Sequence, residues 1–178
     1  MKNLKRFFQR PVFHQPAPPE RSVYEAIVAA ARHPVFYANW GVADTLDGRF
    51  DMISLHGFLV LDRLKGAEEG FRQELVDELF RDMDRSLREM GVGDISVGKK
   101  VRKMAEVFYG RLAAYDRALA AGQGAVAAAL ARNVFADGPA GDGAARLADY
   151  LVDQRRHLAA QETNAIAAGT VQFKEPMP

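Results

Sequence analysis

The residues best suited to chemistry are carboxylates and a histidine in one stretch, YANWGVADTLDGRFDMISLH at positions 37–56. It holds Asp44, Asp47 and Asp51, with His56 following one or two helical turns later. Carboxylate oxygens are the ligands that magnesium and calcium prefer. A calcium-binding EF-hand is excluded, because its ligand spacing around Gly48 falls on residues without carboxylates.

The same aspartates also have a local structural explanation. Asp44 or Asp47 can cap a following helix, and Asp51 interacts favourably with the helix dipole. Gly48 can adopt a left-handed conformation in the turn. The stretch therefore predicts either a ligand-binding turn or simply the start of a helix.

A second acidic motif suggests an enzymatic alternative. Asp47 and Asp51 form a D-x-x-x-D pattern, and Asp149 and Asp153 form another. This arrangement is similar to that of helical isoprenoid synthases, which hold magnesium diphosphate between facing acidic motifs. The chain of 178 residues is much shorter than members of that family. A magnesium-dependent isoprenoid-type enzyme stays an alternative.

Other catalytic patterns are absent from the sequence. There is no cysteine, which excludes disulfides, thiol nucleophiles and thiolate metal sites. The four histidines share no metal-ligand spacing, and no nucleophile or phosphate-loop motif occurs. We therefore expect a protein that is not an enzyme, without catalytic residues, metal or cofactor.

Two basic segments could bind polyanions. In residues 1–13, apolar residues at helical spacing alternate with cations, as in a short amphipathic segment on an anionic membrane. A disordered arm, or a helix docked on the protein's own body, is the alternative. The membrane-surface candidates are Lys2, Leu4, Lys5, Arg6, Phe7, Phe8 and Arg10.

The second basic segment, GKKVRKM, covers residues 98–104. Its cations could contact nucleic acid, the ribosome or lipid head groups. No aromatic residues are interleaved with them, so sequence-specific recognition of nucleic acid is not expected.

The hydrophobic periodicity predicts an all-α, single-domain bundle of about six helices. These cover about 23–33, 50–65, 68–90, 98–121, 125–136 and 144–160. Ser22 and Glu25 form a capping-box pattern at the first helix. The second helix is apolar on nearly every side, which predicts a central position. Gly110 predicts a close contact within the fourth helix, and Val171 and Phe173 are expected to pack against the body.

Composition supports one globular domain. Hydrophobic residues make up 48% and charged residues 26%, and the formal net charge is +1. We expect residues 1–20 to form a basic arm with a proline-rich linker, and residues 21–178 to form the helical domain. No apolar run reaches about 20 residues and no secretory signal is evident, so we expect a cytoplasmic protein, with a peripheral position on the inner face of the cytoplasmic membrane as the alternative.

Three ordered blocks resemble the ubiquinol-cytochrome c chaperone family, whose members assemble the respiratory cytochrome bc complex. They are WGVADTLDGRFDMISLH at 40–56, VGKKVRKMAEVFYGRLAAY at 97–115 and ALARNVF at 129–135. The resemblance implies an all-helical, non-enzymatic chaperone that binds newly made cytochrome b, with the ribosome or an anionic membrane surface as further partners. The absence of a long presequence favours a bacterial member.

The resemblance also carries over functional positions from the first two blocks, Gly48 and Gly110 among them, which either contact the client or hold the fold. The partner-binding candidates are Trp40, Asp44, Asp47, Arg49, Phe50, His56, Lys100, Lys103, Tyr109 and Arg111. A helper for a membrane protein needs an apolar hollow rimmed by charge. We therefore expect such a hollow beside the turn at 44–50.

Overall fold

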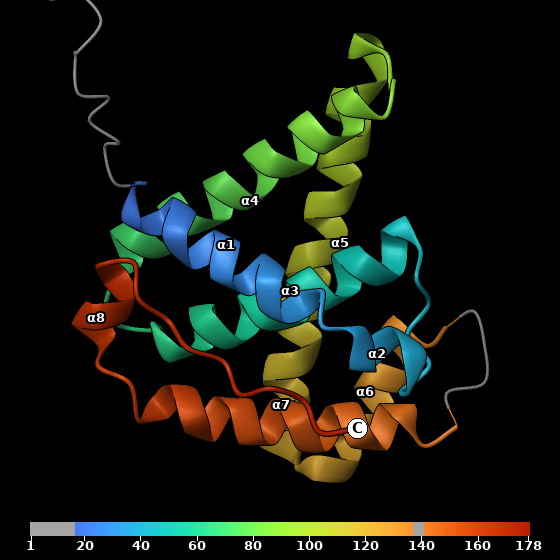
Figure 1. Ribbon diagram of the computed structural model, residues 1–178, viewed down its shortest axis with the longest axis vertical. Helices are drawn as coiled ribbons and strands as arrows, with labels where there is room; N and C mark the ends of the chain where they lie inside the picture. Colours follow the sequence, from blue (N-terminus) through green and yellow to red (C-terminus); the bar gives the residue numbers. More distant parts are fainter. Residues whose placement is uncertain (1–16, 137–140) are drawn as a thin grey trace, which may run out of the picture.

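The computed structural model of the protein describes residues 17–136 and 141–178. Every regular secondary-structure element in these residues is a helix (Figure 1). This confirms the predicted all-α bundle, and each of the six predicted helices is present. Two five-residue helices, α2 and α8, were not predicted. The elements are α1 (Pro19–Ala31), α2 (Pro34–Ala38), α3 (Leu46–Arg63), α4 (Glu69–Glu89), α5 (Asp94–Ala121), α6 (Gln123–Val134), α7 (Gly143–Ala159) and α8 (Thr163–Ala167).

Helix α3 is the centre of the molecule, as its sequence predicts. Every residue from Phe50 to Leu61 is buried. Helices α1, α5, α6 and α7 all pack against it. A helix that is apolar on nearly all sides is stable in water only when neighbours surround it in this way.

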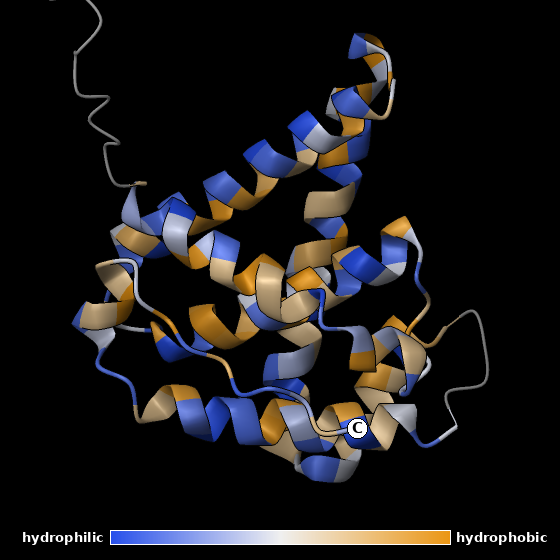
Figure 2. Ribbon diagram, in the orientation of Figure 1, coloured by the Kyte–Doolittle hydropathy of each residue, from blue (hydrophilic) through white to orange (hydrophobic). Residues whose placement is uncertain are grey.

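Helices α4 and α5 form a hairpin whose tip projects from the rest of the molecule (Figure 1). The outer face of α4 is hydrophilic (Figure 2), and its stripe from Phe71 to Leu87 is buried. Met90, the C-cap that follows this stripe, is 55% exposed.

The first helix starts earlier than the capping-box pattern predicts. Helix α1 begins at Pro19 with Pro18 at its N-cap, so the prediction that Ser22 caps it is wrong. Proline fits the first turn of a helix, where no partner for its missing N–H is needed. Glu25 instead accepts a hydrogen bond from Arg21 at 2.8 Å.

Close packing occurs at a different glycine from the one predicted. Gly110 is exposed, and a Cβ built on it would meet nothing within 4 Å, so the predicted contact there is wrong. Gly57 is a buried glycine that faces α5, since its Cβ position lies 3.6 Å from Phe108 Cε2, an ordinary van der Waals distance.

The chain after α8 runs back along α7 (Figure 1). The Gln154 side chain both donates to the Lys174 carbonyl and accepts from its amide, and Gln161 does the same with Gln172. Phe173, between these contacts, packs against the core, and so does Val171. Both contacts were predicted. The tail is thus part of the folded domain.

Candidate functional site

The polar turn before α3 is held by Thr45, not by an aspartate. The amide of Gly48 donates to Thr45 Oγ1 at 3.1 Å, which makes Thr45 the N-cap of α3. Asp44, a predicted cap, instead pairs with Arg49 at 2.7 Å. The hydrogen bond from Arg49 holds the pKa of Asp44 below its usual value.

Gly48 lets the chain at Ala43 lie close to α3, and it does not adopt the left-handed conformation that the turn was expected to need. It lies within α3, and it is not among the glycines with positive φ. A Cβ at this position would lie 2.0 Å from the carbonyl oxygen of Ala43. The incoming chain can therefore lie directly against the first turn of α3.

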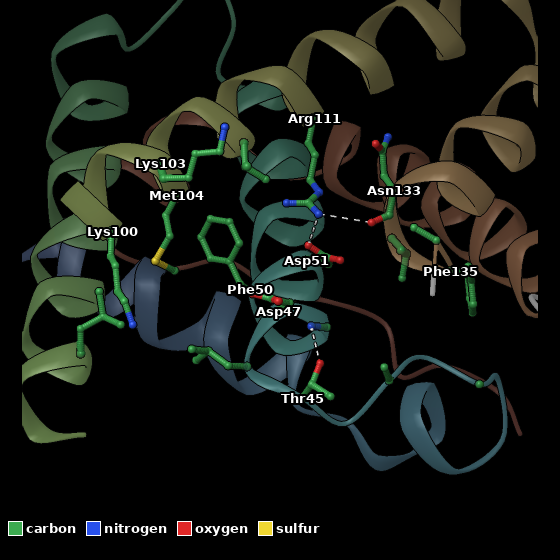
Figure 3. A pocket seen from close by; sticks show the side chains of 18 residues that line it. Thr45, Asp47, Phe50, Asp51, Lys100, Lys103, Met104, Arg111, Asn133 and Phe135 are labelled. Atoms are coloured by element: carbon green, nitrogen blue, oxygen red, sulfur yellow. Dashed lines mark hydrogen bonds and ion pairs between the residues drawn. The ribbon is translucent and has the colours of Figure 1, made fainter. Parts of the chain in front are cut away.

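A cavity of about 620 Å³ opens beside this turn, between α3, α5 and α6 (Figure 3). Apolar side chains from several elements line it, including Leu46, Phe50, Leu87, Met104, Val107, Val134 and Phe135. Its charged lining residues are Asp47, Asp51, Lys100, Lys103 and Arg111. A cavity therefore lies where a hollow was expected, and both apolar and charged side chains line it.

A buried ion pair forms one wall of the cavity. Arg111 on α5 lies 2.5 Å from Asp51 on α3, and the two side chains are only 15% and 7% exposed. Arg111 also donates to the Asn133 carbonyl at 3.2 Å and lies over the Phe50 ring. One guanidinium thus fixes α3, α5 and the end of α6 relative to one another (Figure 3).

The structure brings half of the predicted partner-binding residues together. Asp47, Phe50, Lys100, Lys103 and Arg111 all line the cavity. They come from two of the sequence blocks, separated by about 50 positions, which the fold places side by side.

Other predicted residues lie away from this cavity. Asp44 and Arg49 line a separate hollow with Tyr37, and Tyr109 is exposed on α5, in ring contact with Phe80. Trp40 and His56 are buried. Their burial argues against direct contact with a partner in this conformation, and a role for them in binding stays a prediction.

His56 belongs to an aromatic cluster beneath the turn. Its Nδ1 lies 2.8 Å from the Met52 carbonyl and its Nε2 lies 2.9 Å from the Tyr150 hydroxyl. Since a carbonyl only accepts, Nδ1 carries the proton and Nε2 accepts from Tyr150. Phe36 and Phe173 pack edge-on against the imidazole. Burial lowers the pKa of His56 to about 4.

This burial predicts a pH-dependent stability. Between pH 6.5 and 4 the unfolded chain binds a proton at His56 that the folded protein does not. The free energy of unfolding therefore decreases as the pH is lowered across this window. We expect His56 alone to remove about 2 kcal/mol of unfolding free energy between pH 7.5 and 5. Urea denaturation at both pH values, on the wild type and on His56→Gln, separates this contribution from that of the carboxylates. An equal loss in both proteins would contradict it.

The paired aspartate motifs do not face one another across the cavity. Asp47 and Asp51 line it, whereas Asp149 and Asp153 do not. Asp149 accepts from Gln123, and Asp153 pairs with Arg156 at 3.3 Å. In residues 17–136 and 141–178, no group of three or more histidines and carboxylates is placed to hold a metal ion. These placements argue against the diphosphate-binding alternative.

Several cavity residues were not nominated from the sequence, namely Leu46, Leu87, Met104, Val107, Asn133 and Phe135. Met104 and Val107 lie in the second sequence block, and Asn133 and Phe135 in the third. Membership of these blocks, together with an apolar side chain, is the signal that could have identified most of them.

Two further predictions concern the membrane. The membrane-surface candidates between Lys2 and Arg10 lie outside the described residues. Within the part of the chain that the structure describes, no helix combines the length and apolar character needed to cross a bilayer.

Comparison with known proteins identifies relatives of this chain. A relative from Xenopus laevis, ubiquinol-cytochrome-c reductase complex assembly factor 1, is 26% identical over 116 residues. That match covers 64% of this chain and 58% of the relative, so the chain spans less than two thirds of the relative's length. The crystal structure of the Cbp3 homolog from Brucella abortus is 44% identical, with a TM-score of 0.79 over 88% of each chain.

The family model for the ubiquinol-cytochrome C chaperone matches residues 38–173. This range contains α3 to α8, the cavity and the three sequence blocks. The chain therefore belongs to the ubiquinol-cytochrome c chaperone family.

Proposed function

We propose that this protein is a non-enzymatic assembly chaperone for the cytochrome bc complex, and that it binds unassembled cytochrome b. The relative from Xenopus laevis is named as an assembly factor of that complex. The cavity between α3, α5 and α6 is the observation that carries the proposal, because both apolar and charged side chains line it.

The size of the cavity limits what it can hold. A volume of about 620 Å³ lies within the range of about 300–1,000 Å³ typical of ligand pockets. It accommodates a few side chains and not an entire membrane-spanning helix. The client therefore contributes a short apolar segment, which packs against Phe50, Met104 and Val107 as an amphipathic helix packs in a groove.

The charged edge suits a segment that enters or leaves a membrane. Lys100 and Lys103 lie on one side and Asp47 on another. Such charges keep the hollow hydrated when empty and set the orientation of a bound segment. Arg49 and Tyr109, outside the cavity, stay predictions as additional contacts.

Met104→Glu tests this proposal. Met104 is half-buried in the cavity wall, and a carboxylate there loses hydration when an apolar segment covers it. We expect capture of cytochrome b from solubilised membranes to fall about tenfold or more, since 1.4 kcal/mol suffices for tenfold. Ala113→Glu makes the same change in charge on the exposed side of α5 and is the matched control.

Two results would contradict the proposal. One is equal capture of cytochrome b by Met104→Glu and Ala113→Glu, with both proteins folded by circular dichroism. The other is a deletion strain with normal levels of the cytochrome bc complex.

A further inference from the structure

The tip of the α4–α5 hairpin presents apolar side chains to solvent. Ile95 is 90% exposed and Met90 is 55% exposed. They are two of the five large hydrophobic residues exposed in the described part of the chain. Single exposed hydrophobic residues are common on protein surfaces, but here two of them lie together at one tip.

The tip is a defined structure. The Val92 amide donates to the Leu87 carbonyl at 3.0 Å, and Gly91 adopts the left-handed conformation with φ of 82° that closes α4. Val97, one helical turn beyond the start of α5, is fully buried and anchors the tip to the hairpin. Ile95 therefore points outward from a fixed turn.

Cations follow the apolar tip along α5. Lys99, Lys100, Arg102 and Lys103 are all exposed. They begin at the sixth residue of α5, beyond the first turn, so the helix dipole does not account for them.

The acidic residues near the tip leave a positive surplus. Asp94 pairs with Arg88, and Glu106 lies 3.2 Å from Lys103. Glu89 is exposed. Residues 88–106 hold five cations and three acids, a surplus of two positive charges.

We propose that the hairpin tip, residues 90–103, is a docking site for an anionic membrane surface. Ile95 and Met90 enter the interfacial layer, and the cations behind them contact lipid phosphates. A nucleic acid would match the cations, but it would leave the exposed Ile95 without a role. Figure 2 shows hydrophobic and hydrophilic residues side by side at this tip.

Docking at the tip would place the cavity close to the bilayer. Sixteen residues separate Ile95 from Arg111 on α5, which corresponds to about 24 Å along the helix. Lys100 and Lys103 belong to both surfaces, since they also line the cavity. A segment that leaves the membrane beside the tip would reach the cavity within that distance.

Vesicle flotation with the full chain tests the proposal. We expect binding to vesicles of phosphatidylcholine with phosphatidylglycerol, and little binding to phosphatidylcholine alone. Ile95→Asn should weaken binding about tenfold, and Lys99→Gln or Arg102→Gln about fivefold each. Met177→Asn is the matched control, because Met177 is 81% exposed at the other end of the chain, and it should bind as the wild type does.

The basic arm at residues 1–13 could bind vesicles by itself, so Ile95→Asn is also measured with Phe7→Ser and Phe8→Ser in the same chain. A loss of vesicle binding caused by Ile95→Asn in this background supports docking through the hairpin tip. The proposal would be overturned if Ile95→Asn left vesicle binding unchanged in both backgrounds. So would binding of poly(U) that depends on Lys99 and Arg102 without any binding to vesicles. These vesicles contain no cytochrome b, so the result is independent of the proposed client.

Discussion

Arg111→Met is expected to lower the free energy of unfolding by about 3 kcal/mol. The substitution leaves Asp51, which is only 7% exposed, without the guanidinium that lies 2.5 Å away. Removing one partner of a buried ion pair costs more than the pair contributes, because the remaining charge stays buried. Urea denaturation followed by circular dichroism measures the loss.

The double variant Arg111→Met with Asp51→Asn identifies the cause. It removes the buried charge together with its partner, so we expect it to recover part of the lost stability. Arg117→Met changes an exposed arginine on the same helix and should shift stability by less than about 0.5 kcal/mol. A similarly small shift for Arg111→Met would show that the pair does not hold the cavity wall.

Gly48→Ala is expected to destabilise the protein by about 3 kcal/mol. The added Cβ would lie 2.0 Å from the Ala43 carbonyl oxygen, which is backbone and cannot rotate away. The loop at 41–45 must then move off α3, and it carries part of the cavity lining. Thermal denaturation measures the change.

The matched control for this substitution is Gly110→Ala. It adds the same methyl group within a helix, but into open space. Here we expect a gain of about 0.5–1 kcal/mol, because alanine restricts the unfolded chain more than glycine does. The two substitutions should therefore have opposite signs, and a shared sign would refute the packing argument.

Long periodic helices were predictable from the sequence, and helix ends and short helices were not. The apolar pattern of α3 identifies it as central, because burial on all sides requires apolar residues on all sides. Helices α2 and α8 have five residues each, too few to establish a period. Thr45 was overlooked as a cap because two aspartates beside it have equal or greater cap preference.

Only part of the site could be predicted, because the cavity is a tertiary feature. Its lining comes from the loop before α3, from α3 and α5, and from residues 133–136. Aromatic residues show why the environment of a side chain is hard to predict. Trp40 lies before the apolar helix α3 and Phe50 lies near its start. Trp40 packs into the cluster with Tyr150, whereas Phe50 lines the cavity. Composition does not separate these two environments.

Photocrosslinking from inside the cavity tests the central claim most directly. A photoreactive amino acid replaces Met104 in one protein and Ala113 in another, and both are irradiated in cells that are making cytochrome b. The account predicts an adduct with cytochrome b from position 104 and none from position 113. An adduct from 113 alone, or none from 104 in a folded protein, would contradict it.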